Sequence, residues 1–177
     1  VYDTGSNRIL TANSMHDGAR QICSGWGRYP RTEALVRQPR DTRELQRILN
    51  DGSAQDRIPR GNGCSYGDAA LSGELIGNRW LDELISLDSD RGILRCQAGT
   101  TLDTLTRLLL PRGWLPPVLP GTARVTVGGA VAADIHGKNH HLDGCISDHV
   151  EELTLLSGEG ETITCSAAHR PDVFHAT

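Results

Sequence analysis

Two stretches of the chain carry apolar residues three and four positions apart, which is the spacing of one face of an α-helix. The first begins after Asp41, a potential N-cap with Glu44 at the capping-box position, and ends at Asp51-Gly52. The second begins after Thr101 and stops at Pro111-Arg112-Gly113. The apolar positions are Leu45, Ile48 and Leu49 in the first, and Leu102, Leu105, Leu108 and Leu109 in the second. We therefore predict two amphipathic helices.

Shorter apolar segments predict strands. Ile85–Leu87 and Ile93–Ala98 flank the turn sequence DSDRG. Glu151–Leu156 and Glu161–Cys165 flank Ser157-Gly158-Glu159-Gly160, which is a strong signal for a β-hairpin. The pattern after this hairpin, at residues 171–177, is typical of the first turns of another helix.

The remaining segments lack a clear period. Residues 1–24 show no alternation and are predicted to be irregular, and Trp114–Pro120 contains three prolines, which prevent regular strand pairing. A short apolar piece around Ile58-Pro59 leads into a glycine-rich string. The order of helices, strands and hairpin predicts an α+β fold rather than a doubly wound parallel sheet.

Composition and charge exclude several classes of protein. Hydrophobic residues make up 37% and charged residues 23% of the 177 residues, as in a folded domain. No apolar run approaches the ~20 residues needed to span a bilayer, and residues 1–10 lack the layout of a signal peptide. The formal charge of −4 creates no cationic field for nucleic acid.

The five cysteines are scattered, without a C-x-x-C pair, so neither a disulfide framework nor a zinc knuckle is predicted. We therefore expect a reducing, cytoplasmic location, which includes the surface of the inner membrane.

The first glycine-rich string is PRGNGCSYGD, residues 59–68. Its glycines free the backbone for positive φ, and successive amides in such turns can form a concave site for a phosphate or diphosphate. The dinucleotide fingerprint G-x-G-x-x-G fails, because Tyr66 stands where the last glycine belongs. The alternative is a tight turn with a purely structural role.

The second string is PGTARVTVGGAVAADIHGKNHH, residues 120–141. Its small residues would let the backbone approach a flat ligand, and a helix that begins near Gly128 would add free amides as a second anion site. The alternative is close packing of that helix on a sheet, which also needs glycine and alanine.

This second string ends in the densest polar cluster of the chain, from Asp134 to His141. It contains three of the seven histidines and Lys138, the only lysine among 18 cationic residues. His136 is a candidate proton acceptor and Lys138 a donor for developing negative charge. A metal site on His136, His140 and Asp134 is an alternative, although the zincin pattern fails because Gly137 replaces its glutamate. Walker A and G-x-S-x-G motifs are absent from the sequence.

With GNGCSYGD followed by PGTARVTVGGAVAADIHGKNHH, the chain resembles the FAD-binding domain of the vanillyl-alcohol-oxidase (PCMH-type) flavoproteins, from residues 24–30 through residues 171–177. The resemblance implies two small sheets flanked by helices, and not a Rossmann fold. It also implies that residues 1–177 are the FAD-binding part of a larger oxidoreductase, whose substrate domain and the end of this domain lie beyond them.

In this family the first string wraps the FAD diphosphate, with Tyr66 near the isoalloxazine. The second string supplies further contacts, and His136 and Lys138 face the substrate. Cys64 stands where many relatives carry a histidine that bonds covalently to flavin, so dissociable FAD is expected. The cofactor-binding residues implied are Arg60, Gly61, Asn62, Gly63, Cys64, Ser65, Tyr66, Gly67, Asp68, Gly121, Thr126, Val127, Gly128, Gly129, Ala133, Asp134, Ile135 and His136.

The resemblance implies hydride transfer from a secondary alcohol of a sugar, free or lipid-linked, with a reductase subunit as a further candidate partner. Three alternatives stay open: an alditol or aldonolactone oxidase, a metal-dependent hydrolase, and an FAD-binding chain without catalysis. All flavin hypotheses require that the two glycine-rich strings lie together in the fold.

Overall fold

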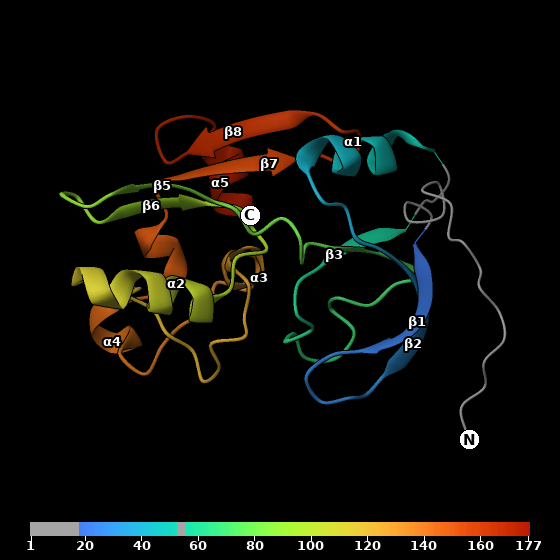
Figure 1. Ribbon diagram of the computed structural model, residues 1–177, viewed down its shortest axis with the longest axis horizontal. Coiled ribbons are helices and arrows are strands. Elements are labelled where there is room, and N and C mark those ends of the chain that lie inside the picture. The colour runs from blue at the N-terminus through green and yellow to red at the C-terminus, as the bar shows by residue number, and fades with distance from the viewer. Residues whose placement is uncertain (1–17, 53–55) are drawn as a thin grey trace, which may run out of the picture.

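The computed structural model describes residues 18–52 and 56–177, which form three small β-sheets with helices beside them (Figure 1). The largest sheet consists of β1 (Ala19–Ser24), β2 (Arg31–Arg37), β3 (Arg57–Arg60) and β4 (Glu74–Gly77). Its strand order is β1-β2-β4-β3. β1 and β2 are antiparallel, whereas β4 runs parallel to both β2 and β3.

Strand β1 shows that part of the segment predicted to be irregular is a strand. Residues 1–17 lie outside the described residues, but residues 19–24 pair with β2 from Ala19–Val36 to Ser24–Arg31. β1 is at the end of the strand order, and only Cys23 in it is buried. Because almost none of its side chains is buried, β1 does not need alternating apolar and polar residues. Its backbone pairing with β2 makes it a strand.

Helix α1 (Thr42–Asn50) begins where the sequence predicts. The Asp41 side chain accepts a hydrogen bond from the Glu44 amide. The Glu44 carboxylate accepts one from the amide of Arg40, one residue before the position expected in a capping box. Ile48 is buried beneath the helix, which confirms the predicted apolar face.

An ion-pair network joins the end of α1 to the four-stranded sheet. Glu74 Oε1 on β4 lies 2.8 Å from Arg37 Nε and 3.0 Å from Arg57 Nε, and Asp51 contacts both guanidinium groups. Arg57 also donates to the Ile48 carbonyl at 2.5 Å. Burial opposes the charge of Arg57, but hydrogen bonds and charges from Asp51 and Glu74 raise its pKa above the usual value.

The next elements are β5 (Leu84–Asp88), β6 (Ile93–Cys96), α2 (Leu102–Leu109) and the 3-10 turn η2 (Leu110–Arg112). β5 and β6 pair antiparallel around the predicted turn. Thr101 caps α2, and the helical segment ends at Gly113 with a φ of 80°. The buried leucines of α2 pack against Leu87, Leu94, Cys96, Val125, Val127 and Ile135.

The remaining elements are α3 (Val127–Ala132), α4 (His140–Asp143), the 3-10 turn η3 (Ile146–His149), β7 (Glu152–Leu156), β8 (Thr162–Ser166) and α5 (Pro171–Ala176). β7 and β8 form the predicted antiparallel hairpin. This hairpin lies beside β5 and β6 (Figure 1), and an ion pair of 2.9 Å between Arg95 on β6 and Glu152 on β7 joins the two.

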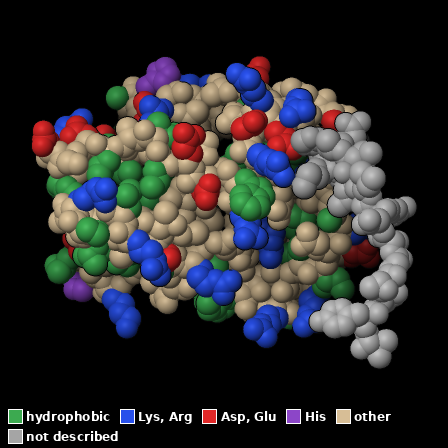
Figure 2. Space-filling view, viewed as in Figure 1, with side chains coloured by type: hydrophobic (Ala, Val, Ile, Leu, Met, Phe, Trp, Pro, Cys, Tyr) green, Lys and Arg blue, Asp and Glu red, His purple; other side chains and the backbone are tan. Residues whose placement is uncertain are grey.

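These elements confirm the α+β class and the prediction that the fold is not doubly wound. The described residues form three sheets rather than the expected two, because β5–β6 and β7–β8 each pair as a separate two-stranded sheet beside the four-stranded one. Within the described part of the chain, no helix has the length and apolar character needed to cross a membrane. Figure 2 shows apolar side chains gathered over α2 and the β5–β6 hairpin, with Lys and Arg side chains along the lower edge.

Candidate functional site

The first glycine-rich loop follows β3 and bends sharply. Gly63 and Gly67 have φ values of 68° and 56°, the left-handed region that favours glycine. The Arg60 guanidinium braces the start of the loop, because it donates to the Ser24 carbonyl at 2.6 Å and to the Ala70 carbonyl at 2.9 Å. Arg60 therefore shapes the loop through its side chain, in addition to any contact with a cofactor.

The backbone amides of this loop have no hydrogen-bond acceptor among the described residues. None of the N–H groups from Gly61 to Asp68 donates a hydrogen bond to any described residue. Most residues of the loop are exposed, so these donors are open to a ligand. A row of accessible amides on a glycine-rich turn is the donor set that a diphosphate needs, and the loop therefore fits the diphosphate of FAD.

The two glycine-rich strings meet, as the flavin hypothesis requires. The Asn62 side chain donates to the carbonyl of Arg124 at 2.9 Å. Gly61 lies against Thr126 so closely that a methyl group at position 61 would overlap Thr126 Oγ1. Residues 61–62 and 124–126 thus form one junction, although they are separated by 62 positions in the sequence.

The start of α3 is engaged within the protein, which corrects the expectation of free amides there. Val127 N donates to the Thr100 carbonyl and Gly128 N to the Ala98 carbonyl, each at 2.8 Å, and Gly129 N donates to Thr126 Oγ1. A Cβ on Gly128 would lie 2.8 Å from that of Ala98. Close packing therefore explains the small residues here, and any cofactor contact of residues 127–129 must use atoms other than these amides.

The segment from Ala133 to Ile135 is also held internally. The three amides donate to carbonyls of α3, and Asp134 Oδ1 accepts from the Ser147 amide in η3 at 3.1 Å. Burial and the neighbouring charge of Asp134 raise the pKa of the Cys145 thiol. The Asp134 carboxylate thus serves η3, and the predicted contacts of residues 133–135 with a cofactor stay a prediction.

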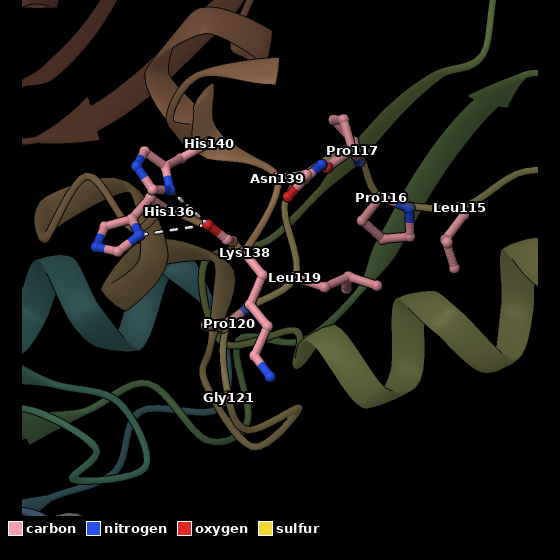
Figure 3. A pocket seen from close by; sticks show the side chains of 11 residues that line it. Leu115, Pro116, Pro117, Leu119, Pro120, Gly121, His136, Lys138, Asn139 and His140 are labelled. Carbon is pink, nitrogen blue, oxygen red and sulfur yellow. Dashed lines mark hydrogen bonds between the residues drawn. The ribbon is translucent and has the colours of Figure 1, made fainter. Parts of the chain in front are cut away.

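Beside this segment lies a pocket of about 760 Å³ with one apolar and one polar wall (Figure 3). The apolar wall comes from the proline-rich connector that precedes the second glycine-rich string. The polar wall comes from the histidine-lysine segment after α3. The lining residues are Leu115, Pro116, Pro117, Leu119, Pro120, Gly121, His136, Gly137, Lys138, Asn139 and His140.

Two imidazoles in the polar wall share one acceptor. His136 Nδ1 lies 3.4 Å and His140 Nδ1 3.2 Å from the Gly137 carbonyl oxygen, and the ring centroids are 5.2 Å apart (Figure 3). Because a carbonyl only accepts, both contacts favour the tautomer with the proton on Nδ1. The Nε2 lone pair of His136 is then available to accept a proton.

Asn139 holds the two walls together. Its side-chain amide donates to the Pro117 carbonyl at 3.0 Å and to Asp143 Oδ2 at 2.6 Å. The backbone at Gly137 approaches Leu119 so closely that a Cβ would lie 3.1 Å from the Leu119 carbonyl oxygen. Sequence reasoning missed Asn139 as a functional residue, because its contact with Pro117 spans 22 positions of the sequence and no local pattern signals it.

Lys138 is exposed and extends toward Gly121, away from the two imidazoles (Figure 3). No carboxylate among the described residues forms an ion pair with it, so its charge is available to a ligand. The structure thus places the predicted catalytic pair in one pocket but directs the amine and the imidazole to different parts of it.

The metal alternative loses its ligand set in this geometry. Asp134 Oδ1 accepts a hydrogen bond from the Ser147 amide in η3, and the carboxylate does not join His136 and His140 as a third ligand. Across residues 18–52 and 56–177, no three His, Cys, Asp or Glu side chains gather in a way that could hold a metal ion.

The junction between the glycine-rich strings can be tested by changing Asn62. We expect Asn62→Ala to weaken FAD binding about five- to tenfold, because it removes a hydrogen bond worth about 1 kcal/mol that holds the loop. Asn62→Asp should weaken binding further, since it places an acceptor against the Arg124 carbonyl and a negative charge near the diphosphate. Flavin fluorescence titration measures both; an Asp variant that binds as tightly as wild type would contradict the proposed junction.

Comparison with known proteins agrees with this geometry. The sequence profile of a family described as "FAD binding domain" matches residues 33–166. The chain is 40% identical to decaprenylphosphoryl-beta-D-ribose oxidase from Mycolicibacterium smegmatis over 86% of this chain and 35% of that protein. It is 28% identical to D-arabinono-1,4-lactone oxidase from Eremothecium gossypii over 88% of this chain and 30% of that protein.

The chain spans about a third of the length of these curated relatives. The profile match covers most of the described residues, including both glycine-rich strings and the pocket. Open loop amides, a close junction between the two strings and this match lead to one conclusion: the chain belongs to the FAD-binding domain family of FAD-linked oxidases.

Proposed function

We propose that this chain is the FAD-binding part of an oxidoreductase that oxidises a secondary alcohol of a sugar, with a polyprenylphosphoryl sugar as the substrate. The observation that carries the proposal is the two-walled pocket, which combines an apolar surface with the side chains of His136 and Lys138. The similarity to decaprenylphosphoryl-beta-D-ribose oxidase supports this choice of substrate.

The cofactor is held by the first loop and its junction with the second. Amides between Gly61 and Asp68 bind the diphosphate, and Asn62 keeps this loop against Arg124. Bound FAD supplies the acceptor for a hydride from the carbinol carbon. Cys64 is a free, half-buried thiol, and we propose that the cofactor is held without a covalent bond.

The polar wall accepts the hydroxyl proton of the substrate and binds its negative charge. His136 accepts the hydroxyl proton at Nε2, while the Gly137 carbonyl holds the ring through Nδ1. Lys138, which extends toward Gly121, binds the phosphoryl group or stabilises the developing alkoxide. The apolar wall from Leu115 to Pro120 excludes water from one side and contacts the prenyl chain.

A second candidate is an aldonolactone oxidase, which the similarity to the Eremothecium gossypii protein favours. The two candidates differ in the electron acceptor that they need. We propose that the polyprenylphosphoryl-sugar enzyme passes electrons to a partner, with a reductase subunit acting downstream, whereas an aldonolactone oxidase would reduce oxygen directly.

The test is spectroscopic. The full protein is purified and its visible spectrum recorded before and after acid precipitation. We expect flavin absorption in the native protein and release of all the flavin into the supernatant. Anaerobic addition of a polyprenylphosphoryl pentose should bleach the flavin, and an aldonolactone should not. Protein without flavin absorption, and without FAD uptake in a titration, would contradict the proposal.

A further inference from the structure

The turn that joins β1 to β2 contacts the open loop of the cofactor site. Residues 24–26 of this turn lie before the family match, which begins at residue 33. The Trp26 amide donates to the Ser65 carbonyl at 2.8 Å, and the Ser24 carbonyl accepts from Arg60 at 2.6 Å. The turn thus contacts the loop at its start and near its end.

Gly25 fits between these two contacts without room for a side chain. A Cβ at this position would lie 2.5 Å from the Ser65 carbonyl oxygen and 2.9 Å from that of Gly67. Gly25 is buried, and its φ lies outside the left-handed region, so space rather than backbone conformation requires glycine here. The turn therefore packs against two carbonyl groups of the loop.

These carbonyls determine where the neighbouring amides point. In a planar trans peptide, the C=O and the N–H of the next residue point in opposite directions. Because the Ser65 and Gly67 carbonyls face the turn, the amides of Tyr66 and Asp68 point away from it. Both amides belong to the row that has no acceptor among the described residues.

We infer that the Ser24–Trp26 turn is a positioning element for the diphosphate of FAD. It holds the Ser65 and Gly67 peptides so that the Tyr66 and Asp68 amides are oriented before the cofactor arrives. The loop has glycines at positive φ, and its amides have no acceptor among the described residues, so the support from this turn lowers the ordering cost of binding. The inference rests on the proposed function, in that it requires FAD as the ligand.

The chain offers a matched pair of variants within the same turn. In Gly25→Ala the new methyl group displaces the two loop carbonyls, whereas a Cβ on Gly27 meets no atom within 4 Å. Both changes lower the conformational entropy of the unfolded chain to the same extent. A difference in FAD affinity between the two variants therefore reports the contact with the loop. We expect the dissociation constant for FAD, measured by fluorescence titration on the full chain, to rise at least tenfold for Gly25→Ala and less than twofold for Gly27→Ala.

Hydrogen exchange separates positioning from a general loss of stability. Gly25→Ala should speed exchange in peptides that cover residues 61–68 and leave β4 unchanged, while Gly27→Ala should match wild type in both regions. If Gly25→Ala does not fold, Arg60→Lys provides the second variant, because it keeps the charge but loses the fork that holds Ser24 and Ala70. It should weaken FAD binding about threefold or more.

Equal FAD affinity of Gly25→Ala and Gly27→Ala, or faster exchange throughout β4, would overturn the inference while the proposed function stands. Wild-type protein that takes up no FAD would overturn the proposed function, and this inference with it.

Discussion

Replacing His136 with asparagine is expected to slow anaerobic flavin reduction by the sugar substrate about 10²- to 10⁴-fold, the usual contribution of a general base. Asparagine can still donate to the Gly137 carbonyl, as His136 Nδ1 does, but it has no counterpart of the Nε2 lone pair. The change thus removes the proton acceptor while it keeps the local hydrogen bond. The measurement is stopped-flow absorbance of the flavin in the full protein.

His141→Asn serves as the matched control. His141 is exposed and does not line the pocket, although its ring lies 5.9 Å from that of His140. Its rate of flavin reduction should stay within twofold of wild type. If both variants reduce flavin equally fast, or if His136→Asn is unchanged, His136 is not the base and another group must accept the hydroxyl proton.

Glu74→Gln is expected to lower the free energy of unfolding by about 3 to 5 kcal/mol, because it leaves two largely buried guanidinium groups with one carboxylate fewer. Glu74 is only 8% exposed, and its Oε1 contacts both Arg37 and Arg57. Glu33→Gln is the control, since Glu33 pairs with Arg20 at the surface and such pairs contribute about 1 kcal/mol or less.

Urea unfolding followed by circular dichroism measures both glutamate variants. If the urea midpoint falls equally in the two variants, burial of the ion-pair network adds nothing to its contribution to stability. The network holds the end of α1 against β3, and β3 leads directly into the open loop, so loss of Glu74 should also weaken FAD binding.

Local sequence patterns predicted most of the secondary structure. The caps of α1 and α2, the β5–β6 pair, the β7–β8 hairpin and the start of α5 all lie where apolar spacing and turn residues indicate. Each of these features depends on residues within a few positions of one another. β1, β2 and β4 were not predicted, and β1 is a strand because it pairs with β2 and not because of an alternating pattern of its own.

For the candidate site, the sequence identified the glycine-rich strings and the histidine-lysine cluster but not how each is used. The two strings looked equally suited to bind anions. Only the structure distinguishes them. The carbonyls of Ala98 and Thr100 accept hydrogen bonds from the amides at the start of α3, whereas the amides from Gly61 to Asp68 have no acceptor among the described residues. The roles of Asn139 and Gly25 depend on contacts with Pro117 and Ser65, which no local pattern encodes.

The amino-acid order alone determined which segments could form helices and hairpins, which loops could adopt left-handed conformations, and which side chains could exchange protons. These properties belong to single residues and their near neighbours. Tertiary packing decided which amides stay open, how the two glycine-rich strings meet and where the lysine amine points. A hydrogen bond such as that between Asn62 and Arg124 forms only when folding brings distant segments within 3 Å, so the cofactor site is a property of the folded chain.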